Sequence, residues 1–242
     1  MPTAISIFIG CGGSDIGLKK AGFKILMATD ILQYACDTYK LNMQDTEVLC
    51  RNISEIDKFS SADVLIGCYP CQGFSQGGVR DPQRNINYLY REFDRVLRIV
   101  KPKAFIVENV SGMVRSNYKY LLRNQVTRFR SAGYKVTGPE VLNSYDYGVA
   151  QTRKRIFMVG IRSDIGIRYN FPIPTHGPKG KLPGRTQLKV LKNMPEWPEG
   201  EFYDKEFHWY YLSRNRRREW NEPCATILSN ARHMPLHPPV HL

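Results

Sequence analysis

The sequence predicts an α/β fold in which a parallel sheet carries helices on both faces. Three observations lead to this fold class. Short apolar runs of strand length alternate with stretches of helical periodicity through residues 1–164, which is the pattern of successive βαβ units. Glycine, proline or polar residues punctuate these runs. Hydrophobic residues make up 42% of the 242 residues, which is enough to fill a core of this kind.

The predicted elements follow in order along the chain. Apolar runs predict strands at residues 4–10, 24–30, 63–67, 104–107 and 155–161. Periodic stretches predict helices at residues 14–21, 33–41 and 89–100. Ligands of such sheets bind beyond the carboxyl ends of the strands, so we expect the chemistry of the chain at those ends.

Charge and proline divide the chain into two parts. The chain has 35 Lys and Arg against 22 Asp and Glu, a formal net charge of +13. Residues 1–120 carry 15 basic and 12 acidic side chains, residues 121–242 carry 20 and 10, and ten of the 15 prolines follow residue 164. We therefore predict one domain over residues 1–164 and a basic, irregular region over residues 165–242. The positive excess favours nucleic acid or another polyanion as the partner.

Composition also excludes several classes of protein. No apolar run is long enough to span a membrane, and residues 1–10 lack the basic region and cleavage site of a secretory signal. Six cysteines without framework spacing predict a reducing compartment. We therefore expect a cytoplasmic protein without a membrane partner.

The second region contains a basic and aromatic stretch. Its residues are Trp209, Tyr210, Tyr211, Arg214, Arg216, Arg217, Arg218 and Trp220. A solvated surface explains basic residues in general, but the aromatic rings beside them favour phosphate contact with aromatic support.

A glycine-rich turn follows the first predicted strand. Gly10, Gly12 and Gly13 let the backbone turn sharply and approach a ligand closely. Asp30 lies 20 residues after Gly10, at the end of the second strand, where a carboxylate accepts hydrogen bonds from ribose hydroxyls. These residues favour a site for a nucleoside cofactor over a simple tight turn. They do not distinguish a nicotinamide cofactor from S-adenosylmethionine.

Two cysteines follow the third predicted strand. Cys68 and Cys71 form a CxxC pair, which is typical of redox and zinc sites. The sequence has no second CxxC, and the next candidate ligands lie far along the chain, so we expect no metal site. A buried, inert cysteine is the alternative for either residue.

Charged residues mark the last two predicted strands. Glu108 directly follows an apolar run, where an unpaired carboxylate is costly to desolvate. It is either a cap or ion-pair partner, or a proton donor or acceptor whose pKa is raised by burial. Arg153 and Arg155 lie on one side of an extended segment. Each is either solvated, or the two face the same cleft as Cys71 and clamp an anionic group or lower a thiol pKa.

Taken together, these residues resemble the DNA cytosine-5 methyltransferase family. The resemblance runs in order through residues 4–164, and its motifs are Phe8 to Gly13 with Gly17, Asp30, Pro70-Cys71-Gln72 with Phe74 and Ser75, Glu108-Asn109-Val110, and Gln151 with Arg153 and Arg155. The resemblance implies a Rossmann-like sheet that uses S-adenosylmethionine, followed by a smaller target-recognition region. The shift in charge and proline near residue 165 fits that division independently.

For the catalytic site, the resemblance implies that Cys71 is the nucleophile that attacks C6 of a cytosine. Glu108 would hydrogen-bond or protonate N3, Arg155 would contact the base carbonyl or orient the site, and Arg153 would support them. The cytosine would be flipped out of double-stranded DNA, under a loop at residues 75–87 that closes over the DNA.

For the cofactor, the resemblance implies contacts from the glycine turn and from the ends of neighbouring strands. The expected residues are Phe8, Gly10, Gly12, Gly13, Asp30, Ile31, Asn52, Ile53, Pro70 and Leu89. Asp30 would hold the ribose. Leu89 would lie near the adenine, although packing of a helix on the sheet explains it equally well.

The sequence departs from the family pattern in three places. Asn52 stands where the family commonly has an aspartate, and Leu32 replaces a frequent acidic residue. Residues 221–242 approach a further family segment, and the C-terminal helix that completes the cofactor pocket is not in this sequence. We therefore expect either an enzyme completed by a second polypeptide or a truncated, catalytically silent DNA-binding remnant.

Two other activities rank lower. The tRNA-modifying relative of the family carries a Cys-Phe-Thr triplet, which does not occur here. A nicotinamide oxidoreductase would leave Cys71, Glu108 and the two arginines unexplained. A bacterial member of the family is expected at the nucleoid, in a restriction-modification setting.

Overall fold

The structure is a computed structural model that describes residues 1–70, 88–114, 119–193 and 217–227. The chain forms two compact units. The first comprises Met1–Val141 and Arg155–Phe171, and the second comprises Leu142–Lys154 and Pro172–Leu242. Leu142–Lys154 thus groups with the later residues, and the functional division at residue 165 stays a prediction.

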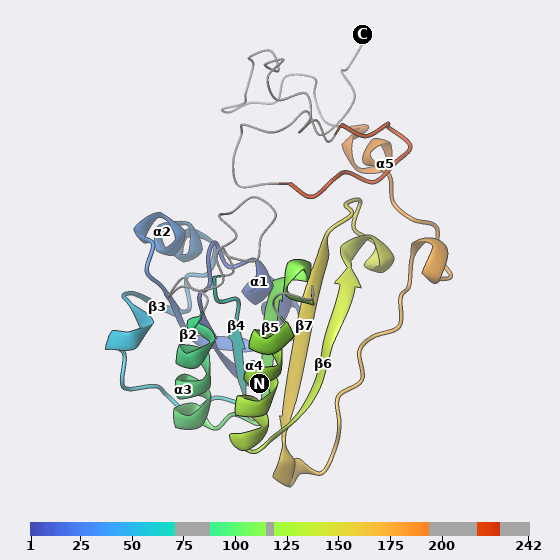
Figure 1. The fold of residues 1–242 in the computed structure, drawn as a ribbon. Coiled ribbons are helices and arrows are strands. Elements are labelled where there is room, and N and C mark those ends of the chain that lie inside the picture. The colour runs from blue at the N-terminus through green and yellow to red at the C-terminus, as the bar shows by residue number, and fades with distance from the viewer. Residues whose placement is uncertain (71–87, 115–118, 194–216, 228–242) are drawn as a thin grey trace. The chain divides into compact units, whose positions relative to one another are not determined.

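The first unit is built on one seven-stranded sheet with strand order β3-β2-β1-β4-β5-β7-β6 (Figure 1). The strands are β1 (Thr3–Ile7), β2 (Lys24–Asp30), β3 (Glu47–Cys50), β4 (Val64–Gly67), β5 (Ala104–Val110), β6 (Tyr134–Asn143) and β7 (Lys154–Arg162). The α-helices are α1 (Gly13–Lys20), α2 (Gln33–Asn42), α3 (Tyr90–Val100), α4 (Lys119–Ser131) and α5 (Gln187–Leu191). Every predicted strand and helix is present, with its ends within three residues of the prediction.

The sheet is not parallel throughout. Strands β3, β2, β1, β4 and β5 run parallel, but β7 pairs antiparallel with β5. The prediction of a parallel sheet is therefore wrong for β7. Because β6 and β7 are neighbours in the sheet and in the sequence, the chain returns directly instead of crossing over through a helix.

Two hydrophobic cores cover the two faces of the sheet, because successive side chains of a strand point to opposite faces. In β1, Ile5 and Ile7 belong to a core shared with α3 and α4. Ala4 belongs to a second core, to which α1 contributes Leu18 and α2 contributes Tyr39. Helices cover both faces of the sheet, as predicted, so a ligand site is expected at the carboxyl ends of the parallel strands.

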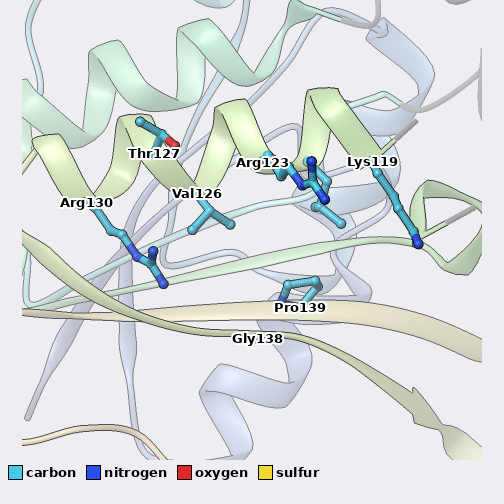
Figure 2. Close-up of a pocket in the computed structure, with 8 residues that line it drawn as sticks. Lys119, Arg123, Val126, Thr127, Arg130, Gly138 and Pro139 are labelled. Atoms are coloured by element: carbon cyan, nitrogen blue, oxygen red, sulfur yellow. The ribbon is translucent and has the colours of Figure 1, made fainter. Parts of the chain in front are cut away.

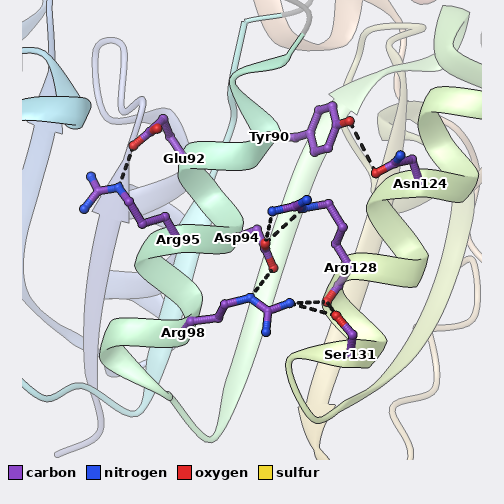
Figure 3. Close-up of polar contacts among 8 residues, drawn as sticks. All are labelled: Tyr90, Glu92, Asp94, Arg95, Arg98, Asn124, Arg128 and Ser131. Carbon is purple, nitrogen blue, oxygen red and sulfur yellow. Dashed lines mark hydrogen bonds and ion pairs between the residues drawn. The ribbon is translucent and has the colours of Figure 1, made fainter.

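An ionic cluster joins α3 to α4 (Figure 3). Asp94 of α3 is only 1% exposed, and its two carboxylate oxygens receive Arg98 Nε at 3.1 Å and Arg128 Nη2 at 2.6 Å. The hydroxyl of Tyr90 also reaches Asn124 Oδ1 of α4, at 3.4 Å. A buried carboxylate needs such partners, so this cluster fixes how the two helices lie on the sheet.

The second unit is described in part. The side chain of Gln187, in α5, donates to the carbonyls of Arg218 and Glu219 at 3.2 and 3.1 Å. Thr152 N donates to Cys224 O at 2.8 Å, which ties residues near 224 to the segment before β7. Hydrogen bonds to the backbone therefore hold this irregular unit together.

Candidate active site

Polar residues gather at the carboxyl ends of the parallel strands in the first unit. Residues 8–13 follow β1, Asp30 ends β2, residues 68–70 follow β4, and Glu108 lies near the end of β5. The strand order reverses its direction between β1 and β4, and ligands of open α/β sheets bind beyond such a reversal. The structure thus places the predicted residues of these segments along one edge.

Asp30 closes the glycine turn. Its Oδ2 accepts a hydrogen bond from Gly10 N at 2.9 Å, and its Oδ1 accepts one from Leu32 N at 3.0 Å. Gly12 adopts φ +86°, and a Cβ there would come within 2.8 Å of the Tyr39 ring. Glycine at this position is therefore required by both backbone conformation and space.

The same turn leaves room for a ligand. A Cβ at Gly10 or Gly13 would meet no atom of the described residues within 4 Å. Each carboxylate oxygen of Asp30 keeps a second lone pair after accepting one backbone hydrogen bond. An open glycine backbone beside a carboxylate with free acceptor capacity fits a nucleoside with ribose hydroxyls.

A buried carboxylate lies behind the turn. Asp15 in α1 has no exposed surface; Ser6 Oγ donates to it at 2.8 Å and the Tyr39 hydroxyl at 2.7 Å. Burial raises the pKa of Asp15, while these hydrogen bonds act in the opposite direction. Asp15 thereby joins α1 to β1 and α2 beneath the glycine turn.

Replacing this residue, Asp15→Asn, should change how stability depends on pH. Because the folded pKa lies above the unfolded value of 3.8, the Asp15 carboxyl stabilises the fold fully below pH 3.8, and this stability is lost as pH rises through the folded pKa. The asparagine does not titrate, so the free energy of unfolding of the variant, relative to the original chain, should rise over the same interval.

Urea unfolding at several pH values from about 4 to 8, followed by circular dichroism, measures this difference. Asp45→Asn, at an exposed position, controls for the change in net charge. A difference between Asp15→Asn and the original chain that stays constant with pH would contradict the prediction.

Cys68 does not supply a thiolate. Burial, with a further contribution from the Glu108 charge, raises the pKa of the Cys68 thiol far above its ordinary value. Ser14 acts in the opposite direction and lowers the pKa of this thiol. A thiol held protonated in this way is a poor nucleophile and a poor redox partner, so Cys68, which is half-buried, fits the inert alternative.

The segment after β4 is held by neighbouring elements. Asn109 of β5 is 2% exposed, and its Nδ2 donates to Tyr69 O at 3.2 Å. The Tyr69 hydroxyl donates to Gln125 Oε1 of α4 at 2.5 Å, and its ring packs edge-on against Phe8, with 6.3 Å between centroids. Contacts with Asn109, Gln125 and Phe8 therefore hold Tyr69, the residue before Pro70, in place.

Glu108 and Arg155 form an ion pair at the end of β5. Arg155 Nε lies 2.9 Å from Glu108 Oε1, and the side chains of Arg155 and Glu108 are 21% and 24% exposed, respectively. The antiparallel register places Arg155 opposite Val110, so the arginine points to the same region as the carboxylate two residues earlier. A half-buried carboxylate beside a guanidinium can accept a hydrogen bond or exchange a proton with a ligand.

The other predicted cofactor residues lie at the same edge in different settings. Phe8 adopts φ +59°, and Ile31 is 63% exposed. Asn52 caps a short 3₁₀ turn with its side chain. Ile53 is buried in the core, and Leu89 packs against the same core at the start of α3, so packing explains both side chains.

Several predicted residues cannot be placed with this edge. Cys71, the loop at residues 75–87 and most of the basic and aromatic stretch lie outside the described residues. Arg153 belongs to the second unit, where its carbonyl accepts a hydrogen bond from Ser144 N at 3.0 Å. Their roles stay predictions.

The buried residues that hold the site in place from behind were not predicted from the sequence. Asp15 and Tyr39 hold the glycine turn from below, and Gln125 holds Tyr69. A signal for the first pair was present, because Ser6 is a polar residue inside the apolar first strand and needs a partner when buried. Gln125 lies in a helix that the sequence reasoning did not predict.

Comparisons with known proteins give one consistent result. The chain matches the family described as C-5 cytosine-specific DNA methylase over residues 3–233. It is 33% identical to the type II methyltransferase M.BspRI of Lysinibacillus sphaericus and 32% identical to M.BsuRI of Bacillus subtilis, in each case over 97% of this chain. These alignments cover 62% and 60% of the relatives, so the chain spans about three-fifths of their length.

Solved structures agree on the fold. A DNA modification methyltransferase encoded within an E. coli prophage superposes with a TM-score of 0.71 and 24% identity, over 85% of this chain and 59% of that chain. The Dnmt2 methyltransferase of S. pombe superposes with a TM-score of 0.64 and 18% identity, over 93% and 71%. The predicted Rossmann-like methyltransferase fold and the resemblance drawn from the motifs are thus confirmed. The chain belongs to the C-5 cytosine-specific DNA methylase family.

Proposed function

We propose that this chain transfers a methyl group from S-adenosylmethionine to C5 of a flipped-out cytosine in a specific sequence of double-stranded DNA. The observation that carries the proposal is the Glu108–Arg155 ion pair, 2.9 Å long, at the carboxyl end of β5. Asn109, the residue after Glu108, donates a hydrogen bond to the carbonyl of Tyr69. Tyr69 is followed in the sequence by Pro70 and Cys71. The type II methyltransferases to which the chain is similar favour a restriction-modification setting.

Cys71 is the proposed nucleophile. C5 of cytosine is a poor nucleophile, and attack of a thiolate on C6 makes it carbanion-like. An S–C6 bond would form, and C5 would take the methyl group, which leaves S-adenosylhomocysteine. Transfer of the C5 proton to water would then break the S–C6 bond and release the Cys71 thiolate. Only the thiolate attacks, and the raised pKa of Cys68 makes it the poorer candidate of the two cysteines that follow β4.

Glu108 is proposed to act on N3 of the base. Attack at C6 places negative charge on the ring, and a carboxyl group that hydrogen-bonds or protonates N3 stabilises this charge. Arg155, already paired with Glu108, keeps the carboxyl oriented and is able to donate to the base carbonyl. Arg153 is proposed to support the nucleophile.

The glycine turn and Asp30 are proposed to hold S-adenosylmethionine, whose sulfonium supplies an electrophilic methyl group. The free lone pairs of Asp30 would accept the ribose hydroxyls, and the open backbone at Gly10 and Gly13 leaves space for the ligand. The exposed side chain of Ile31 provides an apolar surface beside it.

The proposed partner is double-stranded DNA. A base inside a duplex is stacked, so the target cytosine has to be flipped out, at a cost of a few kcal/mol. The proposed place of action is the bacterial nucleoid. Neither the family match nor the relatives point to a second polypeptide, and no helix among the described residues has the length and apolar character that a membrane crossing requires.

Trapping the covalent adduct tests the proposal. The chain is incubated with S-adenosylmethionine and a duplex in which every cytosine is replaced by 5-fluorocytosine. Fluorine at C5 cannot leave as a proton, so the S–C6 bond persists. We expect a DNA-linked species on a denaturing gel, and mass spectrometry should locate it at Cys71.

The matched controls are Cys71→Ser, which should form no adduct, and Cys68→Ser, which should still form one. A chain that binds DNA and S-adenosylmethionine but forms no adduct is a silent DNA-binding remnant, and this result would overturn the proposed function.

A further inference from the structure

The outer face of α4 carries a row of cations. Lys119, Arg123 and Arg130 follow one another at spacings of four and seven residues, which places them on one face of a helix. Thr127 stands between the last two on the same face. From Lys119 to Arg130 the row spans 12 residues, or about 17 Å along the helix axis.

These residues line a groove between α4 and β6 (Figure 2). The groove has a volume of about 410 Å³, and Leu122, Val126 and Pro139 form its floor. In Figure 2 the side chains of Arg123 and Arg130 extend from α4 towards the strand that carries Gly138 and Pro139. The groove is therefore apolar at its base and cationic along its rim.

The charges on the rim are not neutralised within the part of the chain that the structure describes. Among those residues, no carboxylate pairs with Lys119, Arg123 or Arg130, whereas Arg128 of the same helix is paired with the buried Asp94. Glu140, the residue of β6 after Pro139, is exposed and forms no ion pair with a described residue. The positive charge of the groove is thus left for a ligand.

The first half of the row works against the electrostatics of the helix, whereas Arg130 lies in the last turn, where the helix dipole favours a cation. Lys119 lies in the first turn, where the helix dipole disfavours a cation, and no acidic residue lies in that turn. Lys119 and Arg123 are like charges four residues apart, an arrangement that works against helix formation. A surface that only had to be soluble would gain from mixed charges here.

We propose that this groove binds the sugar–phosphate backbone of the DNA that flanks the target cytosine. The three cations would contact phosphates, and the apolar floor would contact deoxyribose. Because a duplex rises about 3.4 Å per base pair, the row matches roughly five steps. The inference rests on the proposed function, which makes double-stranded DNA the substrate.

The inner face of the same helix holds the catalytic segment. Gln125 of α4 accepts the hydrogen bond of the Tyr69 hydroxyl, and Tyr69 lies two residues before Cys71. The chain passes from β5 to α4, so the Lys119 end of the row starts near the edge that carries Glu108. DNA held on the outside of α4 would therefore be held by the helix that positions the nucleophile segment.

Salt dependence of DNA binding tests the inference. The affinity of the full chain for a duplex of about 30 base pairs is measured by fluorescence anisotropy from about 50 to 300 mM salt. The triple variant Lys119→Gln, Arg123→Gln, Arg130→Gln should bind about tenfold more weakly, or worse, at low salt. The slope of log affinity against log salt should become shallower by up to about 2.7, because each phosphate neutralised by the original chain contributes about 0.9.

The matched control removes three exposed cations from other helices, with Lys19→Gln, Lys20→Gln and Lys40→Gln. It should keep the original slope to within the contribution of one phosphate. Circular dichroism checks that both variants fold. A triple groove variant that folds and keeps the slope of the original chain, or a control whose slope falls as much as that of the groove variant, would overturn the inference.

A direct contact is measured by replacing Thr127 with the photo-crosslinking amino acid p-benzoylphenylalanine, which places the crosslinker inside the groove. Crosslinking to the duplex supports the inference. Crosslinking to a poly-glutamate peptide but not to DNA would assign the groove to an acidic protein and would overturn it. The adduct experiment is independent: absence of the Cys71 adduct with intact groove effects on DNA binding would reject the proposed function and leave the groove assigned.

Discussion

Replacing Glu108 with glutamine is expected to lower the rate of methyl transfer by about 10²–10⁴-fold, the usual contribution of a positioned acid or base. Glutamine has the same shape but cannot give N3 a proton or hold the charge that attack at C6 creates. Because Glu108 is about one-quarter exposed and lies near the end of β5, the fold should tolerate the change. The loss should therefore fall on the chemical step.

Single-turnover methylation at saturating S-adenosylmethionine, with enzyme in excess over DNA, measures this rate. The binding of DNA by Glu108→Gln should stay within a few-fold of the original chain. Glu47→Gln, an exposed carboxylate at the start of β3, is the matched control and should keep the full rate. A Glu108→Gln variant with a rate within about threefold of the original chain would remove Glu108 from the chemistry.

The largest expected effects on stability lie where β5 meets β7. Phe105 has no exposed surface, and its ring lies 4.9–5.8 Å from the rings of Phe93, Phe129 and Tyr134. Gly160 is its direct partner across the antiparallel pair. A Cβ on Gly160 would come within 2.0 Å of the Phe105 ring, so the ring fills the space that the glycine leaves open.

Phe105→Ala should lower the free energy of unfolding by about 3–5 kcal/mol, and Gly160→Ala should lower it by about 1–3 kcal/mol through overpacking. The decisive variant is the double substitution Phe105→Leu with Gly160→Ala. Leucine vacates part of the space above residue 160, so the cost of Gly160→Ala should be smaller when it is combined with Phe105→Leu than when it is made alone.

Urea unfolding followed by circular dichroism provides the four free energies of this cycle. Gly17→Ala is the matched control, because a Cβ at this helical glycine would meet no atom within 4 Å; it should stabilise by about 0.5–1 kcal/mol. Additive effects of the Phe105 and Gly160 substitutions would mean that the two residues are not opposite one another, and the register of β7 would be refuted.

That register marks the limit of what the sequence could predict. The run at residues 155–161 has the apolar composition of a buried strand in either direction, since composition carries no sign of orientation. Its direction depends on β6, and β6 was not predicted because its residues alternate weakly and its Gly138 and Pro139 interrupt the pattern. The antiparallel direction is nevertheless what brings Arg155 to Glu108.

Other missed elements have equally specific causes. The strand β3 has only four residues, none of them fully buried, so it lacks the apolar run on which the strand predictions depended. The helix α4 buries Gln125 among its apolar residues and carries four cations, which obscures its periodicity. The long, strongly apolar elements and the residues at the ends of the parallel strands were predicted well, because there a single pattern decides both structure and placement.

The two backbone hydrogen bonds of Asp30 have a consequence for how the protein can evolve. Both carboxylate oxygens already fix the backbone, one at Gly10 and one at Leu32, so any change of this side chain alters loop geometry together with the nucleoside contact proposed for it. Selection for a different cofactor cannot act on Asp30 without disturbing its two neighbours. Ile31 has an exposed side chain, so under the proposed function it is the position at which cofactor preference can drift at little cost to the fold.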